Sequence, residues 1–525
     1  MGVIGKNINS TFVDVDAALA WDEVYSAPGV PRPIYKEIVD VLSNLKTVDI
    51  RTRFDQLGRT FAERGVTFAL GGEERPFPLD LIPRIIAATE WGVLSAGIRQ
   101  RVAALEAFLE DVYGAGECLK DGVVPRRIVT SSSHFRRESV GIVPRYGPRI
   151  TVSGIDIIRD ELGNLRVLED NVRIPSGISY VIENRRAMTQ SFGSLFTHYR
   201  VHPVDEYPAR LLRALRLSAP EGVRDPTVVV LTPGVHNAAY FEHVLLARLM
   251  GIELVEGSDL KVVGNCVMMR TTRGERPVHV IYRRVDDEWL DPLHFRPDSV
   301  VGVAGLVNAA RAKTVTIANA IGNGVADDKL IYTYVPDLIR YFLHEEPLID
   351  NVESYRLDEP EVLHEVLEHL ERYVVKPVDG SGGKGIIIGP QSDEATLLAV
   401  REELLEDPRG YIAQRTVALS TVPTFVDDQL LPRHVDLRPF AVNDGKEVWV
   451  LPGGLTRVAL PEGALVVNSS QGGGSKDTWV LADETLAPTP PGAKAWTRAA
   501  AHSVAPSVNG SVRQPGPAAG SRGDQ

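Results

Sequence analysis

A glycine-rich stretch between two β-branched runs carries the clearest chemical signal in this sequence. It reads Tyr373-Val-Val-Lys-Pro-Val-Asp-Gly-Ser-Gly-Gly-Lys-Gly-Ile-Ile-Ile388. The β-branched runs predict two strands, and Gly380, Gly382 and Gly383 leave backbone N–H groups open to a ligand. Lys376 would place a fixed cation beside a phosphate. The pattern predicts a flap that grips a nucleotide, with a glycine-rich hairpin turn that binds nothing as the alternative.

Two other phosphate motifs are excluded by the residues around these glycines. Gly380, Gly382 and Gly385 formally satisfy G-x-G-x-x-G, but the dinucleotide fingerprint needs a helix that begins at its last glycine. Three isoleucines follow here instead. No G-x-x-x-x-G-K-[ST] surrounds Lys384, which excludes a P-loop. We therefore expect the loop to join two strands.

A second group of polar residues lies on a predicted hairpin earlier in the chain. Two runs with strand character, residues 150–158 and 165–171, flank a short turn. In that register Asp156 faces Glu169, and Asn171 points to the same side. Two carboxylates and an amide oxygen suit a hard divalent cation such as Mg²⁺. The alternative is a solvated polar face, although opposed carboxylates repel each other without a cation.

Other segments are expected to pack around these two hairpins. Helical spacing of apolar residues over 83–113 predicts a long amphipathic helix. Residues 226–270 read as a strand–helix–strand unit, and 278–282 as a further strand, which together predict a small α/β domain. Arg283 and Arg284 follow that strand. They could orient a carboxylate, or they could join a surface ion-pair network with the neighbouring acids.

The composition limits the function classes. The 525 residues carry a net charge of −12, and 44% are hydrophobic and 24% charged. A globular chain of this charge is repelled overall by nucleic acids and anionic membranes. Cys118 and Cys266 form neither a metal-ligand spacing nor a disulfide framework, and we see neither a signal peptide nor a membrane-spanning run. We expect a cytoplasmic protein with no nucleic-acid or membrane partner, and the oligomeric state is left open.

The sequence resembles an ATP-grasp carboxylate–amine ligase in several separate parts: Lys329, Lys376 with its glycine flap, Gln414, and the polar set of the predicted hairpin. In ordinary ATP-grasp chains the metal-binding Glu-x-Asn strand follows the flap, whereas Glu169-Asp-Asn171 precedes it here. That order resembles the circularly permuted ATP-grasp proteins of the type 2 group, which are related to glutathionylspermidine synthetase and eukaryotic glutathione synthetase. The strings that carry the resemblance are Leu168-Glu-Asp-Asn-Val-Arg-Ile-Pro-Ser-Gly-Ile-Ser-Tyr180, Tyr282-Arg-Arg-Val-Asp-Asp287, Pro432-Arg-His-Val-Asp-Leu-Arg-Pro439 and Val467-Asn-Ser-Ser-Gln-Gly-Gly-Gly-Ser-Lys-Asp477.

The resemblance implies a role for each candidate residue. The two lysines would contact the phosphates of ATP under the glycine flap, and Gln414 would lie in the segment that passes the adenine. Arg438 and Arg457 are the candidates for holding the transferred phosphoryl group or an acyl-phosphate, on the physical ground that arginine grips planar anions with two nitrogens. The cofactor-binding set is Lys329, Lys376, Gly382, Gly383, Gly385 and Gln414, the metal set is Asp156, Glu169 and Asn171, and the catalytic pair is Arg438 and Arg457.

The resemblance also implies an α/β fold with α+β elements: a circularly permuted ATP-grasp with a Rossmann-like pre-ATP-grasp domain and a helical N-terminal region. The expected segments are 1–130 (mainly helical), 131–220 (permuted ATP-grasp segment with the metal site), 221–312 (pre-ATP-grasp-like α/β domain), 313–483 (nucleotide-binding segment with the flap) and 484–525. The last segment is dominated by Pro, Gly, Ala and Ser. We expect it to be a disordered tail.

The predicted function is ATP- and Mg²⁺-dependent joining of a carboxylate to an amine through an acyl-phosphate. The partners would be a small-molecule or peptide carboxylate and an amine, whose identities stay open. Such chemistry needs positioning and charge neutralisation rather than a protein nucleophile. The alternatives are a nucleotide-binding module without ligase activity and a phosphotransferase that releases a phosphorylated product.

Overall fold

The computed structural model describes residues 20–482, apart from 46, 71–72, 143, 145–146, 381, 466 and 468–471. The expected tail at 484–525 and the first part of the predicted helical region therefore lie outside the described residues. The segment boundaries given above remain predictions.

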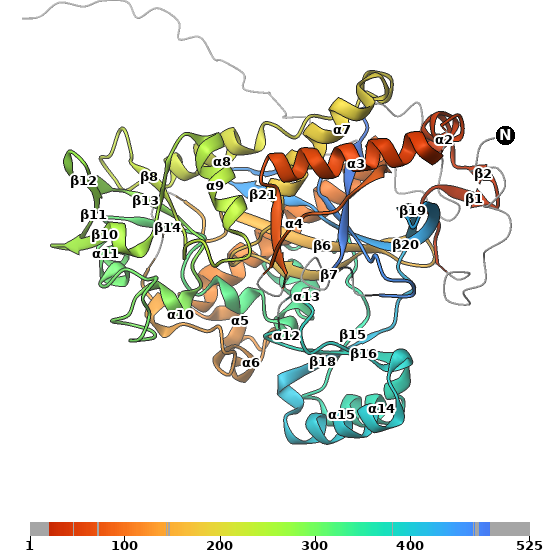
Figure 1. Cartoon of the computed structure of the whole chain (residues 1–525). Helices are drawn as coiled ribbons and strands as arrows, with labels where there is room; N and C mark the ends of the chain where they lie inside the picture. Colours follow the sequence, from red (N-terminus) through yellow and green to blue (C-terminus); the bar gives the residue numbers. More distant parts are fainter. Residues whose placement is uncertain are drawn as a thin grey trace, which may run out of the picture. The chain divides into compact units, whose positions relative to one another are not determined.

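Nine strands of the described chain form one large sheet, which provides the frame of the site (Figure 1). These strands are β5 (Leu79–Ile86), β6 (Val152–Arg159), β7 (Leu165–Asn171), β19 (Thr421–Val426), β20 (Gln429–Arg438), β21 (Phe440–Asn443), β22 (Val448–Val450), β23 (Leu455–Val458) and β24 (Gly474–Val480). The order along the sheet is β22-β21-β6-β20-β23-β24-β5, with β7 paired to β6 and β19 paired to β20. The strand order brings β6 next to β20 although nearly three hundred residues separate them.

Two long helices cover opposite faces of this sheet. They are α4 (Ala88–Val112) and α7 (Ile178–Tyr199). Ile157 of β6 belongs to the apolar cluster that contains the α4 residues, whereas Val152 belongs to the cluster that contains Ile178. Residues of opposite parity on a strand point to opposite faces, so β6 is sandwiched between two cores. A buried polar side chain on this strand is therefore costly unless it finds a partner inside the protein.

The helix predicted over 83–113 begins later than the sequence suggested. Residues 79–86 form β5, and all eight are buried; α4 starts at Ala88. Pro83 is tolerated in the strand because β5 ends the path of the sheet. Among the described strands it pairs with β24 alone, in parallel, with a register shift at this point. A proline without an N–H group fits such an irregular edge position. The helical interpretation of Pro83 was wrong for this physical reason.

A small antiparallel sheet carries the glycine flap. Its strands are β15 (Ser354–Arg356), β16 (Tyr373–Pro377), β17 (Ile387–Ile388) and β18 (Tyr411–Arg415), and its two covering helices are α14 (Pro360–Glu368) and α15 (Glu394–Glu406). The order is β15-β18-β16-β17. Val375 pairs with Ile387 in an antiparallel register. The glycine loop therefore joins two strands, as predicted, and Figure 1 shows α14 and α15 beside this sheet.

A parallel sheet forms the predicted α/β domain. Its strands are β8 (Val228–Leu231), β9 (Glu253–Val255), β13 (Val280–Arg283) and β14 (Thr316–Ala318), in the order β14-β13-β8-β9. Helix α9 (Tyr240–Met250) joins the first two strands and ends at Gly251, whose φ is 67°. The predicted strand, helix and strand are confirmed.

Arg283 and Arg284 are buried rather than exposed. Arg283 pairs with Asp287 at 2.8 Å, and Arg284 pairs with Glu242 at 3.1 Å. Arg283 also donates to the carbonyl oxygens of the chain that follows β14. The suggested pairing with a neighbouring acid is confirmed for Arg283, but its suggested surface location was wrong, because both side chains are buried.

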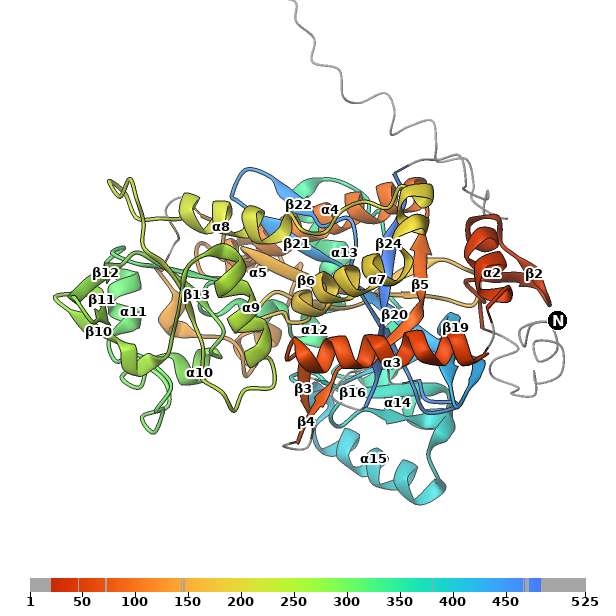
Figure 2. The same cartoon turned by 45° about the horizontal axis from the view of Figure 1, so that its top comes forward.

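The other elements of the described chain connect and flank these three sheets (Figure 2). The strands are β1 (Tyr25–Ala27), β2 (Val30–Pro31), β3 (Thr67–Leu70), β4 (Glu73–Pro76), β10 (Leu260–Val263), β11 (Cys266–Thr271) and β12 (Gly274–Val278). The helices are α2 (Lys36–Ser43), α3 (Thr47–Glu63), α5 (Glu117–Lys120), α6 (Arg126–Thr130), α8 (Tyr207–Leu217), α10 (Asp287–Leu290), α11 (Leu306–Arg311), α12 (Lys329–Tyr332) and α13 (Val335–Leu338). Across the described ranges, every helix is too short or too polar to cross a bilayer.

Candidate functional site

The predicted opposition of acidic residues on the β6–β7 hairpin is present in the structure. Asp156 pairs with Glu169, and Gly154 pairs with Asn171, two residues away on each strand. An irregularity in the register follows between Asp156 and Ile157. The three predicted metal ligands therefore share one face of the large sheet.

Two arginines enclose the carboxylate of Asp156. Its side chain is fully buried, and Arg438 donates from Nε to Oδ1 at 2.5 Å and from Nη2 to Oδ2 at 2.7 Å. Arg457 Nη2 donates to Oδ2 at 2.6 Å. Burial alone would raise the pKa of Asp156, but the guanidinium groups of Arg438 and Arg457 outweigh it and hold this pKa well below its usual range. Asp156 is therefore ionised and already accepts three hydrogen bonds.

The strand order explains how both arginines reach Asp156. Strand β20 lies between β6 and β23, and Asp436 on β20 is directly opposite Arg457 on β23. Arg457 Nε donates to both Asp436 oxygens, at 2.9 and 3.0 Å. Gly154 lets the Arg438 side chain cross β6, because a Cβ at this position would lie 3.2 Å from Arg438 Cδ. The result is a ladder of alternating acids and arginines across three strands.

The other two predicted metal ligands, Glu169 and Asn171, make fewer contacts with other side chains than Asp156 does. The side chain of Glu169 is 26% exposed, and its Oε1 lies 3.7 Å from Arg438 Nη2. The side-chain Nδ2 of Asn171 is buried without a hydrogen-bond partner among the described residues. Such a buried unsatisfied amide costs about 1–3 kcal/mol, so its environment is incomplete. The N–H groups of this amide would be satisfied by an acceptor such as a phosphate oxygen, whereas the amide oxygen of Asn171 and the carboxylate of Glu169 are the kinds of atom that coordinate a hard cation.

The described residues form no group of three or more His, Cys, Asp or Glu side chains with metal-site geometry. The candidate metal face accordingly depends on one amide and on Glu169, with Asp156 largely occupied by arginine. Mg²⁺ commonly takes only one or two carboxylates and completes its shell with phosphate and water oxygens. The donor set is compatible with that kind of ion.

The two predicted lysines lie near each other at the mouth of the glycine loop. Lys376 Nζ donates to Gln414 Oε1 at 2.5 Å, and Gln414 Nε2 donates to Ser354 Oγ at 3.0 Å. Lys329 Nζ donates to the carbonyl oxygen of Gly380 and lies 3.8 Å from Glu169 Oε2. The structure therefore links the metal face, both lysines and the predicted adenine-side glutamine.

The burial of Lys376 alters its acidity. Burial lowers its pKa to about 8, while the negative charge of Glu169 acts in the opposite direction and the positive charge of Lys329 adds to the lowering. A buried ammonium without a strongly charged partner is unfavourable. An incoming polyanion would supply that partner.

The glycine loop uses the conformations that only glycine adopts freely. Gly382, Gly383 and Gly385 have φ values of 66°, 79° and 72°. In addition, a Cβ on Gly385 would lie 3.1 Å from Cγ of Pro377. These positive φ values explain why the sequence has glycines here, and they give the loop a tight, side-chain-poor surface.

A pocket of about 100 Å³ lies between the large sheet and the small sheet. Its polar residues include Asp156, Glu169, Lys376, Gln414 and Arg457, and its apolar walls include Ile158, Leu168 and Leu419 from the large-sheet side and Val374, Ile386 and Ile388 from the flap hairpin. Seven of the predicted site residues, including Lys329 and Arg438, are thus in the pocket or bonded to its rim.

Two contributors to the site were not assigned from the sequence. Asp436 lines the pocket and pairs with Arg457. The sequence held a signal for it, because Asp436 lies two residues before Arg438, and residues two apart on a strand share a face. Ser354, which positions Gln414, had no recognisable signal, since it comes from a three-residue strand distant in sequence.

Comparison with known proteins agrees with this geometry. The family described as circularly permuted ATP-grasp type 2 matches residues 83–459. A Mycobacterium tuberculosis protein (strain ATCC 25618 / H37Rv), named only as uncharacterised, is 61% identical over 470 residues, which cover 90% of this chain and 85% of that protein. A Synechocystis protein that is also named only as uncharacterised is 49% identical over 469 residues, which cover 89% of this chain and 98% of that protein.

Two further matches carry ligase names. A protein of Frankia casuarinae, named as a candidate glutamate–cysteine ligase, is 45% identical over 464 residues, which cover 88% of this chain but only 53% of the Frankia protein. The apo structure of a glutathione synthetase-like effector from Globodera pallida matches 83% of this chain and 98% of its own with a TM-score of 0.56. At 13% identity that likeness concerns the fold alone. The chain belongs to the circularly permuted ATP-grasp proteins of type 2.

Proposed function

We propose that this protein is an ATP- and Mg²⁺-dependent ligase that joins a carboxylate to an amine through an acyl-phosphate. The observation that carries the proposal is that Lys376 and Glu169 line one pocket, and that Lys329 contacts both Glu169 and the carbonyl oxygen of Gly380 in the glycine loop. Asn171 lies two residues beyond Glu169 on the same face of β7. Membership of the ATP-grasp family and the ligase names of relatives support an ATP-dependent ligase in general. The substrate pair is proposed to be a small-molecule or peptide carboxylate and an amine.

The pocket suits one end of a nucleotide better than a charged metabolite. Its walls are mainly apolar, and Gln414 and Lys376 stand at its polar end. Its volume of about 100 Å³ is below the roughly 300 Å³ at which drug-sized ligand pockets begin. Binding a whole ATP therefore requires the flap hairpin, whose Ile386 and Ile388 line the pocket, to move away from the large sheet, after which the glycine loop would close over the phosphates.

Mg²⁺ would be held by Glu169 and Asn171, with Asp156 contributing only the lone pair that its arginines leave. When bound, the ion would neutralise negative charge on the phosphates. The features that fit such an ion are the amide oxygen of Asn171 and the partly exposed carboxylate of Glu169, and the unpartnered Asn171 Nδ2 would donate to a phosphate oxygen. Arg438 and Arg457 fix the orientation of Asp156 behind them.

The chain's own residues would act by position and charge. Lys376 and Lys329 would neutralise the phosphate oxygens, which eases attack of the substrate carboxylate on the γ-phosphate. Arg438, whose side chain is 12% exposed, is the proposed contact of the transferred phosphoryl group, and Arg457 supports it from the interior. The amine then displaces phosphate from the acyl-phosphate, and exclusion of water by the closed loop protects that intermediate.

One observation favours a second candidate function. Arg438 and Arg457 occupy most of the acceptor positions on Asp156, which weakens it as a metal ligand. A nucleotide-binding module without ligase activity has no need of Asp156 as a metal ligand, so it could keep Asp156 paired with these two arginines. A phosphotransferase that stops at a phosphorylated product would use the same pocket.

The test is Mg²⁺-dependent ADP release by the purified protein with pooled amino acids, peptides and polyamines. We expect release that depends on a pool, and mass spectrometry of the product should show an amide. K376A and E169A should each abolish it, whereas K446A should not, since Lys446 is exposed and outside the pocket. Full turnover in both K376A and E169A would refute the assignment. A phosphorylated product without an amide would instead identify a phosphotransferase, and nucleotide binding without pool-dependent release would favour the module.

A further inference from the structure

A short N-terminal segment is joined to the large sheet outside the residues that the family match covers. We call residues 21–24 the N-terminal strap. Asp22 forms a parallel bridge with Thr421, Glu23 N donates to Thr421 O at 3.0 Å, and Thr421 N donates to Trp21 O at 2.9 Å. The strap thus adds a strand-like partner to the start of β19. The family match begins only at residue 83.

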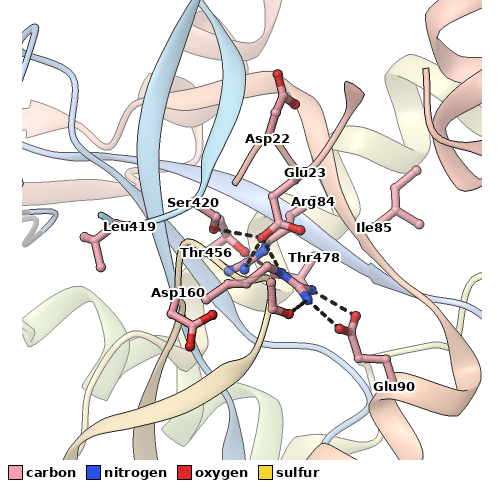
Figure 3. A network of polar contacts seen from close by, with 12 residues as sticks. Asp22, Glu23, Arg84, Ile85, Glu90, Asp160, Leu419, Ser420, Thr456 and Thr478 are labelled. Atoms are coloured by element: carbon pink, nitrogen blue, oxygen red, sulfur yellow. Dashed lines mark hydrogen bonds and ion pairs between the residues drawn. The ribbon is translucent and has the colours of Figure 1, made fainter. Parts of the chain in front are cut away.

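The strap carries a buried acid into the sheet. Glu23 is 4% exposed, and its Oε1 accepts from Arg84 Nη2 at 2.5 Å, from Arg159 Nε at 2.9 Å and from Ser420 Oγ at 2.8 Å. Arg159 continues the network to Glu90 at 2.6 and 3.0 Å. Figure 3 shows Glu23 at the centre of these contacts, with Arg84, Ser420 and Glu90 around it.

Glu23 is ionised and hard to replace. Its burial opposes ionisation, but Arg159 and Arg84 outweigh that effect and lower its pKa to about 2. Arg84 Nε and Nη1 are buried without hydrogen-bond partners in the described part of the chain, so Glu23 is the counter-ion on which this guanidinium depends. Loss of the carboxylate would leave two buried cations undercompensated, which is strongly unfavourable.

The residues that Glu23 holds are immediate neighbours of the nucleotide pocket. Arg159 follows Ile158 and Ser420 follows Leu419, and both apolar residues line the pocket. Ile158 and Leu419 also belong to one small apolar cluster. Ser420 N donates to Arg159 O at 3.1 Å. The end of β6 and the segment before β19 are therefore tied together at the level of Glu23.

A second contact fixes the same wall from the other side. The ring nitrogen Nδ1 of His434 lies 2.7 Å from the carbonyl oxygen of Leu419. Glu23 and His434 thus act on consecutive residues, Ser420 and Leu419. The position of the Leu419 side chain is set by one contact from β20 and one from the strap.

We propose that Glu23 is a positioning residue for nucleotide binding: by joining Arg159 to Ser420 it holds Ile158 and Leu419 in place as the apolar wall of the pocket. The proposal rests on the proposed function, in which this pocket takes ATP. Glu23 does not touch the nucleotide. Its removal should therefore weaken binding without removing any group that takes part in the chemistry.

The experiment compares E23Q with E183Q in the full-length chain. Glu183 is a buried acid between two arginines, Arg64 and Arg186, but it makes no contact with the pocket. The dissociation constant of the non-hydrolysable analogue AMP-PNP with Mg²⁺ is measured by calorimetry, and the melting temperature by calorimetric scanning. We expect E23Q to raise the dissociation constant about tenfold, and E183Q to lower the melting temperature with less than a twofold change in binding.

Two additional readouts keep the proposal open to refutation. S420A removes one of the three contacts of Glu23 and should weaken binding two- to threefold even if E23Q folds poorly. Hydrogen exchange should become faster in residues 417–422 of E23Q and not of E183Q. Equal dissociation constants for wild type, E23Q and S420A, or unchanged exchange at 417–422, would overturn the positioning role.

If the proposed function is wrong, AMP-PNP binding by wild type and the variants differs from the result expected when only the role of Glu23 is wrong. If wild type and K376A bind AMP-PNP equally weakly, the pocket does not take ATP and the proposed function fails. Exchange at 417–422 then still decides whether Glu23 holds the wall. If K376A loses binding while E23Q and S420A keep it, the proposed function stands and the strap is only a structural brace.

Discussion

Strand β6 carries a buried acid–arginine network on each of its two faces, and the networks differ in what they border. Asp156 faces the pocket and is held by Arg438 and Arg457. Arg159, three residues later and on the opposite face, is held by Glu23 and Glu90. The chemistry is the same in both, whereas only the first has a member, Arg438, that lies beside the partly exposed Glu169.

The difference shows how to separate a functional ion network from a structural one without reference to charge. Buried acid–arginine pairs are weak evidence for either role. An unpartnered buried group does not separate them either, because Asn171 lies beside one network and Arg84 belongs to the other, and both have such nitrogens among the described residues. The decisive feature is whether members of the network line the pocket. Asp156 and Arg457 do so, whereas the Glu23 network ends at Glu90 and at the backbone, behind the pocket wall.

The largest expected effect is that of D156N, which breaks the network at the pocket. The change leaves Arg438 and Arg457 without their shared carboxylate, so we expect a loss of about 3–5 kcal/mol in the free energy of unfolding. Pool-dependent ADP release should fall by at least about a hundredfold even at saturating ATP, because the supporting charge of the metal face is lost. Steady-state kinetics and urea unfolding measure the two quantities.

The distinction between the two networks would be wrong if D156N and E23Q changed the rate of ADP release at high ATP concentration in the same way. E23Q should be rescued by high ATP concentration, since only binding is weakened, whereas D156N should not. A D156N protein that reaches the wild-type maximal rate at high ATP would place both networks in the structural class.

The next effect concerns stability in acid. The pKa of Glu23 is lowered from 4.5 to about 2, and a depressed carboxyl pKa stabilises the fold above the unfolded-state value and loses that contribution as pH falls toward 2. About two and a half pKa units correspond to roughly 3 kcal/mol. We expect E23Q to be less stable than wild type by about that amount at pH 7, and the difference should shrink below about pH 4.5.

Urea unfolding of wild type and E23Q from pH 7 to pH 3 measures that difference. The exposed pair of Arg51 and Asp428, whose side chains are 55% and 44% exposed, offers the control. D428N should cost less than about 1 kcal/mol. A gap between wild type and E23Q that stays constant down to pH 3 would contradict the assigned acidity of Glu23.

A smaller effect is expected in the pH dependence of nucleotide binding. Lys376 has a pKa of about 8 in the free protein because it is buried, and bound phosphates should raise it. The charged form therefore predominates below pH 8, and above pH 8 binding must take up a proton. We expect the affinity for AMP-PNP to be constant from pH 7 to about 7.5 and to fall by up to about tenfold per pH unit above pH 8.

Calorimetry in buffers of different ionisation enthalpy would detect that proton uptake. K376R keeps its charge throughout this range, so its affinity, although lower, should not change with pH between 7.5 and 9.5. A flat profile for the wild type up to pH 9.5 would show that Lys376 does not face the phosphates. The phosphates would then have to bind to residues other than those of the flap hairpin.

The sequence predicted the parts of the site that depend on local patterns. The alternation of residues around a short turn was sufficient to place Asp156 opposite Glu169, and the glycines predicted the loop between β16 and β17. These relations are local, because a strand's period and a glycine's positive φ do not depend on the rest of the fold.

The remaining features depend on contacts between distant segments. Arg438 meets Asp156 across 282 residues of sequence, and β5 pairs in parallel with β24, which lies nearly four hundred residues later. Sequence periodicity gives no information about such pairing. For this reason Arg438 was predicted as a phosphoryl ligand, whereas the structure gives it a carboxylate partner as well. The strap and Glu23 were missed for the same reason.

The smallest expected effect tests whether the contact between Arg438 and Asp156 depends on the space that Gly154 leaves for the Arg438 side chain. Gly154 has a negative φ, so alanine is allowed by the backbone, but its Cβ would lie 3.1 Å from Pro175 Cβ and 3.2 Å from Arg438 Cδ. G154A should cost about 1 kcal/mol in unfolding free energy and lower the maximal rate of ADP release about fivefold, because Arg438 must shift away from Asp156. Gly58, in the exposed part of α3, has no neighbour within 4 Å, and G58A should instead stabilise the protein by about 0.5–1 kcal/mol at an unchanged rate. If G154A matched G58A in both respects, the Arg438 side chain would have room to spare, and its contact with Asp156 would not limit the reaction.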